Sequence, residues 1–220
     1  ADENEQENDI QKRIIMQQSM LQVTFRNKKY KNWLFDLLTW LYDNEVNDID
    51  PSQLSEYLDQ WILCYYDNLE GKTSPLEGTD WAFEALGTDT PHFIFNFIDY
   101  LYWVAKRNGK ANVRYTDEVD DFYFRYYNSV EHHLPQSYED TGNVNVDNIG
   151  NLCLISRRKN SSLNDKAPLE KAKIESGLQP KRKIMYRITH DSNGLWGKKQ
   201  IMEHNKDIKS LLDSRKSILS

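Results

Sequence analysis

Apolar residues recur at helical spacing through the first half of the chain. Between residues 9 and 44 they fall three and four positions apart, with an interruption at FRNKKY, and this pattern predicts two helices. A third helix is predicted after Asp50, which can cap it, because Pro51 suits a first helical turn. A fourth is predicted over residues 90–109, where the apolar face is wide and aromatic. These segments indicate a helical scaffold.

The pattern changes near residue 112. The stretch DFYFRYYNSVEHH is rich in aromatic and β-branched residues and predicts a strand. The polar stretch after it, LPQSYEDTGNVNVDNIGN, predicts a long loop. The apolar run LCLIS predicts a second strand, and a helix is expected within residues 157–176. The predicted order is therefore strand, long loop, strand, helix.

Together the two patterns predict an α+β fold. A chain of 220 residues can form one sizeable core or two smaller ones. We expect a mostly helical scaffold domain over residues 1–110 and a mixed domain over residues 111–220. Further helices are predicted at residues 180–190 and 197–217.

Charge is divided unevenly between the two parts of the chain. Residues 1–150 hold 12 Lys and Arg against 27 Asp and Glu, a balance of −15, whereas residues 151–220 hold 16 against 7, a balance of +9. Such asymmetry is a sign of a nucleic acid or another anionic partner for the basic part. Two alternatives are open: the parts attract each other, or the basic helices are merely solvated.

Cysteine usage and hydropathy indicate the compartment. Cys64 and Cys153 are too few for a disulfide framework and lack CxxC spacing, so a reduced, cytoplasmic location is expected and structural zinc is not. The sequence holds no run of about 18 apolar residues, so no membrane-spanning segment is predicted, and a secretory signal is not expected either. Because the chain begins with Ala1 and an acidic, polar tract, we expect it to be a fragment of a longer protein.

Polar residues with catalytic potential gather at the strand ends. The stretch SVEHHLPQ ends the first predicted strand, and further candidates lie where the loop enters the second strand and beyond it. A strand-loop-strand-helix finger brings these segments together, so that groups about 30 residues apart can share one divalent ion. The candidates are Glu131, His132, His133, Asn151, Asn160, Asn164 and Lys166.

The stretches SVEHHLPQ and IGNLCLISRRKNSSLNDKAPLEKAK carry a family resemblance. They resemble the HNH, or His-Me finger, nuclease domain at the C-terminal end of GmrSD-type modification-dependent restriction proteins and related phage-defence proteins. The match covers about residues 126–175. It implies a ββα-metal finger with accessory helices. It also implies an upstream nucleotide-dependent domain as a partner, because proteins of this family usually carry one.

The resemblance implies a metal-dependent endonuclease that hydrolyses DNA. His132 is then the general base, a role that contributes about 10²–10⁴-fold to the rate. Glu131 and Asn160 are the implied ligands of Mg²⁺, with Mn²⁺ or another divalent ion as alternatives. Asn151 is implied to fix the loop and orient the backbone that bears the histidine. Lys166 is expected to be a catalytic residue that contacts phosphate. Further contacts to phosphate or substrate are expected from Arg157, Arg158, Lys159 and Asn164.

Two arguments disagree about which histidine is the base. In a regular strand alternate residues share a face, so Glu131 and His133 would point together and His132 the other way. Strand geometry thus favours His133. The family pattern places the base directly after the acidic residue, and Leu134-Pro135 favours the strand end that this requires, because proline cannot donate to a ladder. His132 is therefore the predicted base, and His133 ranks below it.

Less specific interpretations are open for several of these residues. Glu131 can orient a histidine instead of a metal, Asn160 can cap a helix, and Asn151 can simply form a turn. For the whole chain, the alternative is a catalytically silent DNA-binding or protein-interaction module of the same system. An enzyme that cuts RNA is a third possibility.

Overall fold

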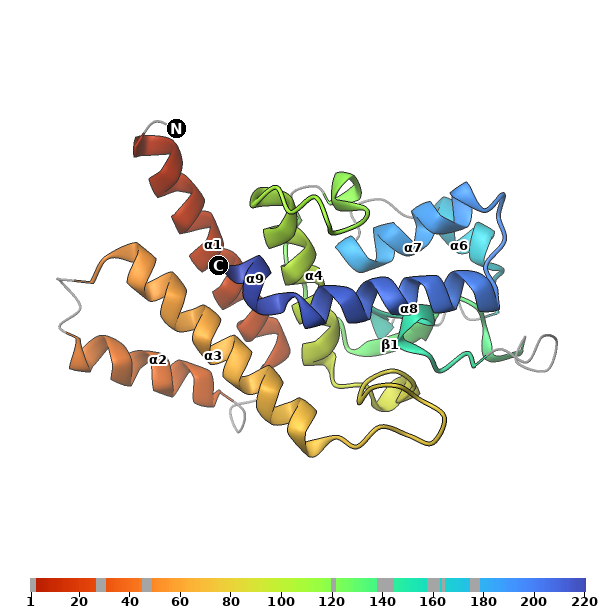
Figure 1. Ribbon diagram of the computed structural model, residues 1–220, viewed down its shortest axis with the longest axis horizontal. Helices are drawn as coiled ribbons and strands as arrows, with labels where there is room; N and C mark the ends of the chain where they lie inside the picture. Colours follow the sequence, from red (N-terminus) through yellow and green to blue (C-terminus); the bar gives the residue numbers. More distant parts are fainter. Residues whose placement is uncertain are drawn as a thin grey trace. The chain divides into compact units, whose positions relative to one another are not determined.

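The computed structural model describes all of the chain except residues 1–2, 27–30, 45–48, 120–121, 138–144, 158–162, 164 and 175–178. The fold is mostly helical with one small antiparallel sheet, which confirms the predicted α+β class (Figure 1). Two compact units are present: Ala1–Leu69 with Tyr123–Arg125, and Glu70–Phe122 with Tyr126–Ser220. Of the helices described, none is apolar over a stretch long enough to cross a membrane.

The first unit consists of helices. The helices α1 (Glu3–Thr24), α2 (Asn32–Asp43) and most of α3 (Pro51–Lys72) form it, with the predicted break between α1 and α2. The predicted cap of α3 is confirmed, since the Ser52 N–H donates to Asp50 Oδ1 over 2.8 Å.

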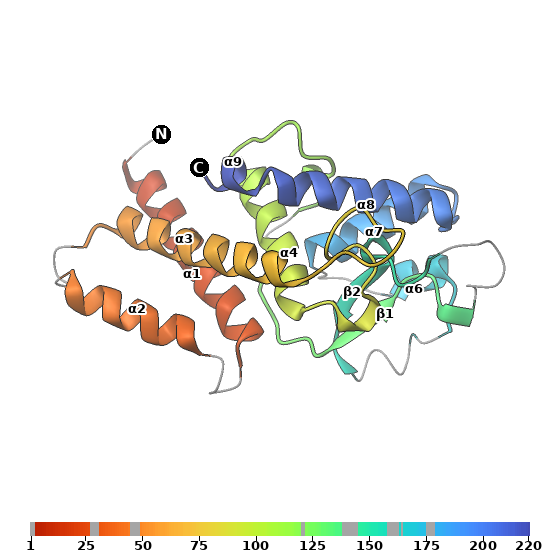
Figure 2. The same ribbon diagram turned by 60° about the horizontal axis from the view of Figure 1, so that its bottom comes forward.

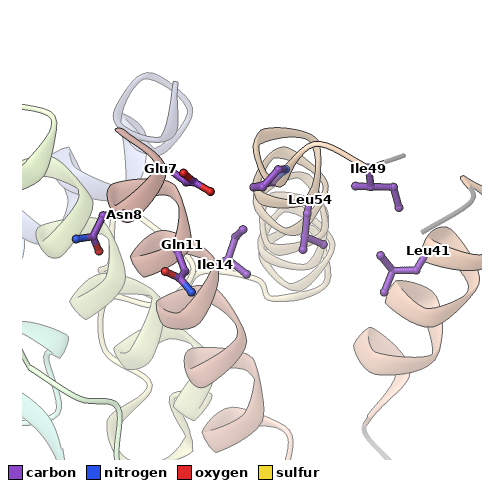
Figure 3. A pocket seen from close by; sticks show the side chains of 8 residues that line it. Glu7, Asn8, Gln11, Ile14, Leu41, Ile49 and Leu54 are labelled. Carbon is purple, nitrogen blue, oxygen red and sulfur yellow. The ribbon is translucent and has the colours of Figure 1, made fainter. Parts of the chain in front are cut away.

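Polar contacts and a cavity lie between these helices. Arg13 Nη2 donates to Asp59 Oδ2 over 2.6 Å, which ties α1 to α3. A cavity of about 450 Å³ lies beside them, and Figure 3 shows its lining side chains on all three helices, Ile14 on α1, Leu41 on α2 and Leu54 on α3 among them. None of the predicted site residues that the structure describes lines this cavity.

The helix α4 (His92–Arg107) forms the core of the second unit. Every residue from Phe93 to Ala105 is buried, as is typical of a helix that is covered on all sides. It contacts α7 (Pro180–Asp191), α8 (Lys198–Asp213) and α9 (Arg215–Leu219). The sequence assigned this helix to the scaffold domain ending near residue 110, whereas its contacts are with helices of the C-terminal part.

The sheet of the second unit has two short strands. β1 (Ser129–His132) pairs antiparallel with β2 (Leu152–Ile155), and His132 lies opposite Leu152. Figure 2 shows the two strands next to each other beside α6 (Pro168–Ile174). The first strand is shorter than predicted, because β2 has only four residues and offers no partner to residues 122–128.

A short 3-10 helix precedes β2 and packs directly on α8. In this element, η6 (Ile149–Asn151), Gly150 lies so close to α8 that an added Cβ would be 2.3 Å from Ile201 O. The two backbones therefore meet without a side chain between them, and a glycine is required at this contact.

A buried lysine joins α7 to the same region. Lys181 Nζ donates to the carbonyl oxygens of Ile149, over 2.9 Å, and Leu152, over 2.5 Å. Its backbone N–H donates to Asp99 Oδ1 of α4 over 2.8 Å. Burial raises the pKa of Asp99 to about 7 and lowers that of Lys181 to about 8, because both charged forms lose hydration.

We predict that Gly150→Ala destabilises the protein while Gly71→Ala does not. The new methyl group at residue 150 must displace the α8 backbone, and such overpacking costs about 1–3 kcal/mol or more. Gly71 of α3 has no atom within 4 Å of an added Cβ, so alanine there is expected to be neutral or to stabilise by up to about 1 kcal/mol. Urea unfolding of both variants measures the difference, and equal midpoints would contradict the close contact.

We also predict that the free energy of unfolding falls as the pH rises from about 4 to about 7 through Asp99. The pKa of Asp99 is raised in the folded state, so the native state binds more protons than the unfolded state between about pH 4 and 7. The stabilisation is therefore complete below the pKa of the unfolded state and is lost as the pH rises through the folded pKa. The loss is on the order of a few kcal/mol at about 1.4 kcal/mol per pKa unit. Asp99→Asn should remove this component, whereas Asp117→Asn at an exposed position should keep it. Unfolding curves of the three proteins across this pH range give the free energy of unfolding at each pH. If this free energy changes with pH equally in all three proteins, the prediction is wrong.

Candidate active site

The finger brings four predicted site residues together. Glu131 and His132 end β1, His133 follows them, and Asn151 directly precedes β2. The antiparallel register sets the end of β1 against the start of β2, and the His133 N–H donates to the Asn151 carbonyl oxygen over 2.8 Å. All four residues are buried, so their side chains have fixed partners.

Asn151 uses the whole hydrogen-bonding capacity of its amide. Its Oδ1 accepts from the Leu134 N–H over 2.8 Å and from Trp196 Nε1 over 2.9 Å. Its Nδ2 donates to the carbonyl oxygens of Leu134, over 3.0 Å, and Val146, over 2.8 Å. Two donors and two acceptor positions are the full inventory of an amide side chain.

These bonds connect three separate segments. Leu134 lies just beyond the two histidines, Val146 lies at the end of the long loop, and Trp196 lies between α7 and α8. Asn151 therefore has the contacts that a residue fixing the loop and the histidine-bearing backbone needs. Its part in catalysis stays a prediction.

His132 pairs with a carboxylate that the sequence did not single out. Its Nε2 lies 2.8 Å from Asp147 Oδ1, and the two side chains are 11% and 43% exposed. A histidine that contacts both a carboxylate and solvent is a suitable general base, because the carboxylate fixes the ring and solvent supplies the water.

His133 points into the core. Its Nε2 lies 2.8 Å from Thr189 Oγ1 of α7, and its ring meets the Trp196 ring edge to face at 4.7 Å between centroids. Burial, followed by the nearby cations Lys171 and Arg182, lowers its pKa well below the usual value, so the ring is neutral. These contacts match a packing residue. The choice of His132 over His133 as the base stays a prediction.

Glu131 is paired with a lysine. Lys171 Nζ of α6 donates to Glu131 Oε1 over 2.6 Å and to the His132 carbonyl oxygen over 2.6 Å. Both side chains are buried, at 1% and 8% exposure, so the ion pair ties α6 firmly to β1.

This pairing bears on the expected metal ion. A carboxylate oxygen is a suitable ligand for Mg²⁺, but the ammonium group already neutralises Glu131, and a divalent ion beside it would be repelled. Within the described part of the chain, no group of three His, Cys, Asp or Glu side chains could hold a metal ion. The second expected ligand, Asn160, lies outside the described residues. The described side chains alone thus do not form a metal site.

Two of the expected phosphate-binding residues are described, and both are exposed. Arg157 follows β2, and its backbone N–H donates to Asn128 Oδ1 over 3.2 Å. Lys166 lies in the turn before α6, where its N–H donates to the Leu163 carbonyl oxygen. The remaining candidates, Arg158, Lys159 and Asn164, lie outside the described residues.

The sequence did not identify Asp147, Lys171 and Trp196 as parts of this site. Asp147 stands in a polar loop among asparagines, and Lys171 stands in a helix among other lysines, so each resembles a solvated residue. Of the three, only Trp196 could have been suspected from the sequence. A tryptophan in a segment between two predicted helices is usually buried against other parts of the protein.

Comparison with known proteins identifies the family of this domain. Residues 88–211 match the family described as GmrSD restriction endonucleases, C-terminal domain, and the match includes α4, both strands and most of α8. No curated protein and no solved structure matches the chain. The resemblance seen in the sequence is confirmed. Because the match spans more than half of the 220 residues, the chain belongs to the family of GmrSD restriction endonuclease C-terminal domains.

Proposed function

We propose that this domain is an HNH-type endonuclease that hydrolyses phosphodiester bonds of DNA, with His132 as its general base. The pairing of His132, whose side chain is 11% exposed, with the Asp147 carboxylate is the observation that carries the proposal. Membership of a restriction endonuclease family supports the class of reaction. The finger supplies the base from the end of β1, where the backbone leaves the sheet and the imidazole can meet solvent.

His132 acts in the step that forms the new bond to phosphorus. Its ring takes a proton from a water molecule as the water oxygen attacks the phosphorus atom, and the bond from phosphorus to the leaving 3′ oxygen breaks. The resulting imidazolium is next to a carboxylate, which stabilises the charge.

A divalent ion, Mg²⁺ by preference or Mn²⁺, belongs to the proposal. When bound, such an ion supplies positive charge at the phosphate and at the leaving oxygen. Glu131 and Asn160 are the residues that would hold it, and Glu131 would then have to share its carboxylate with Lys171.

The basic C-terminal part supports binding to the phosphate backbone. Residues 151–220 carry a balance of +9, and Arg157 and Lys166 are exposed on the finger. With Arg158, Lys159 and Asn164 they are the proposed contacts to phosphate or substrate, which makes affinity dependent on salt. The proposal extends to a cytoplasmic restriction or phage-defence system, in which an upstream nucleotide-dependent domain controls cleavage.

One observation favours a second candidate function. Because Lys171 already pairs with Glu131, the buried carboxylate needs no metal ion to balance its charge, which favours a silent DNA-binding or protein-interaction module. The two candidates differ in turnover.

We predict that the protein nicks supercoiled plasmid DNA and that His132→Ala slows nicking by about 10²–10⁴-fold, the contribution of a general base. His190→Ala is the matched control, because His190 is exposed on α7 and should leave the rate unchanged. Gel analysis of plasmid forms over time measures the rates, and labelled RNA in a parallel reaction tests the other polymer.

Three outcomes would count against this assignment. Equal rates for His132→Ala and the wild type would remove His132 from the chemistry. Binding to DNA without cleavage of several DNA types would favour the silent module. Cleavage of RNA but not of DNA would show that RNA, rather than DNA, is the substrate.

We further predict that EDTA abolishes nicking and that excess Mg²⁺ or Mn²⁺ restores it, since a divalent ion would stabilise the charge that develops at the phosphate and the leaving oxygen. Calorimetric titration of Mn²⁺ into the protein, compared with Glu131→Gln, tests the ligand apart from activity. Unchanged binding in that variant would exclude Glu131 as the ligand, and nicking that persists in EDTA would exclude metal dependence.

A further inference from the structure

Asp147 contacts the proposed base directly, although neither the sequence pattern nor the family description assigns it a function. Its Oδ1 lies 2.8 Å from His132 Nε2, across 15 residues of chain. An ionised carboxylate can only accept hydrogen bonds, so the proton between them belongs to Nε2. The neutral ring then has Nδ1 as its one nitrogen that can take a proton.

The backbone around Asp147 is held on both sides. The Asp147 N–H donates to Asn145 Oδ1 over 3.1 Å, and its carbonyl oxygen accepts from the Gly87 N–H over 3.1 Å. Two residues later the Ile149 N–H donates to the Glu84 carbonyl oxygen over 2.7 Å. Asp147 thus sits in a turn that is fixed to a second segment, residues 84–87.

Gly87 lies close against the carboxyl group of Asp147. Its φ of +57° is a conformation that side chains other than glycine rarely adopt. A Cβ added there would lie 2.8 Å from Asp147 Cγ. The backbone of η3 (Gly87–Asp89) therefore limits where the carboxyl group can move and keeps it against His132.

Asn151 connects the two members of the pair. Its Nδ2 donates to the carbonyl oxygens of Val146, one residue before Asp147, and Leu134, two residues after His132. One buried side chain thus sets the spacing between the loop that bears the carboxylate and the strand that bears the imidazole. A surface carboxylate that met a histidine by chance would lack this shared support.

We propose that Asp147 is the positioning residue of this site: it accepts the Nε2–H of His132, fixes the ring, and directs Nδ1 to the attacking water. The inference deepens the proposed nuclease function and rests on it. Asp147 acts through His132 and contacts neither the attacking water molecule nor the phosphate. Its loss should lower kcat by at least about 10-fold and by no more than the 10²–10⁴-fold that a general base contributes, and should leave KM nearly unchanged.

The test compares Asp147→Ala with Asp117→Ala, an exposed position on η4 (Thr116–Glu118). Plasmid nicking gives kcat and KM, and thermal unfolding shows that both variants are folded. NMR of protein labelled with ¹⁵N-histidine gives a second measurement, the proton bound to His132 Nε2. We expect a downfield, slowly exchanging resonance in the wild type and in Asp117→Ala, absent from Asp147→Ala and from His132→Gln, which assigns it.

The outcomes separate this inference from the nuclease proposal. A folded Asp147→Ala that nicks at the wild-type kcat, or faster, overturns the positioning role. So does an Nε2 proton resonance that persists in Asp147→Ala or is missing from the wild type. If the wild type cleaves no nucleic acid, the nuclease proposal fails, and the NMR comparison alone decides whether Asp147 holds the ring of His132.

Discussion

The arrangement of this finger depends on a single buried amide. Asn151 spends both of its donors and both acceptor positions on the protein, and its partners belong to the end of the first strand, the end of the long loop and the segment between the last two long helices. The first two of these segments bear His132 and Asp147, and Trp196 of the third packs against His133. Because a buried amide loses its hydration, only complete pairing makes its burial favourable, and complete pairing admits one geometry of the three segments.

Two buried lysines attach the sheet to the helices in a similar way. Lys171 of α6 and Lys181 of α7 each donate to main-chain carbonyl oxygens at one end of a strand, and each also contacts a carboxylate-bearing residue, Glu131 or Asp99. Desolvation of an ammonium group is unfavourable, so these contacts add little net stability compared with an apolar core. What they contribute is direction, because a charged donor requires its acceptors at defined positions.

The helices were predictable because their apolar periodicity is a local property, and α1 to α4, α7 and α8 fall where it placed them. The segment predicted as helical over residues 197–217 is divided into α8 and α9. Local composition overestimated the length of the first strand, because a strand forms ladder hydrogen bonds only where a partner strand lies beside it. The contacts of the candidate site were harder to predict. His132 meets Asp147 and Glu131 meets Lys171 across 15 and 40 residues, and a lone aspartate or lysine carries no mark of such a partner. Motif resemblance predicted the histidine and Asn151 as site residues, but it did not predict the residues that hold them.

The main chain of His132 is held independently of its side chain. The residue pairs with Leu152 in the sheet, and its carbonyl oxygen accepts from Lys171, so the strand end keeps its place whichever side chain it bears. The imidazole is therefore replaceable in a way that most buried groups are not. If the proposed function holds, a protein without it would keep the surface that contacts DNA, which would make such a variant a suitable reagent for capturing uncut DNA and identifying its sequence.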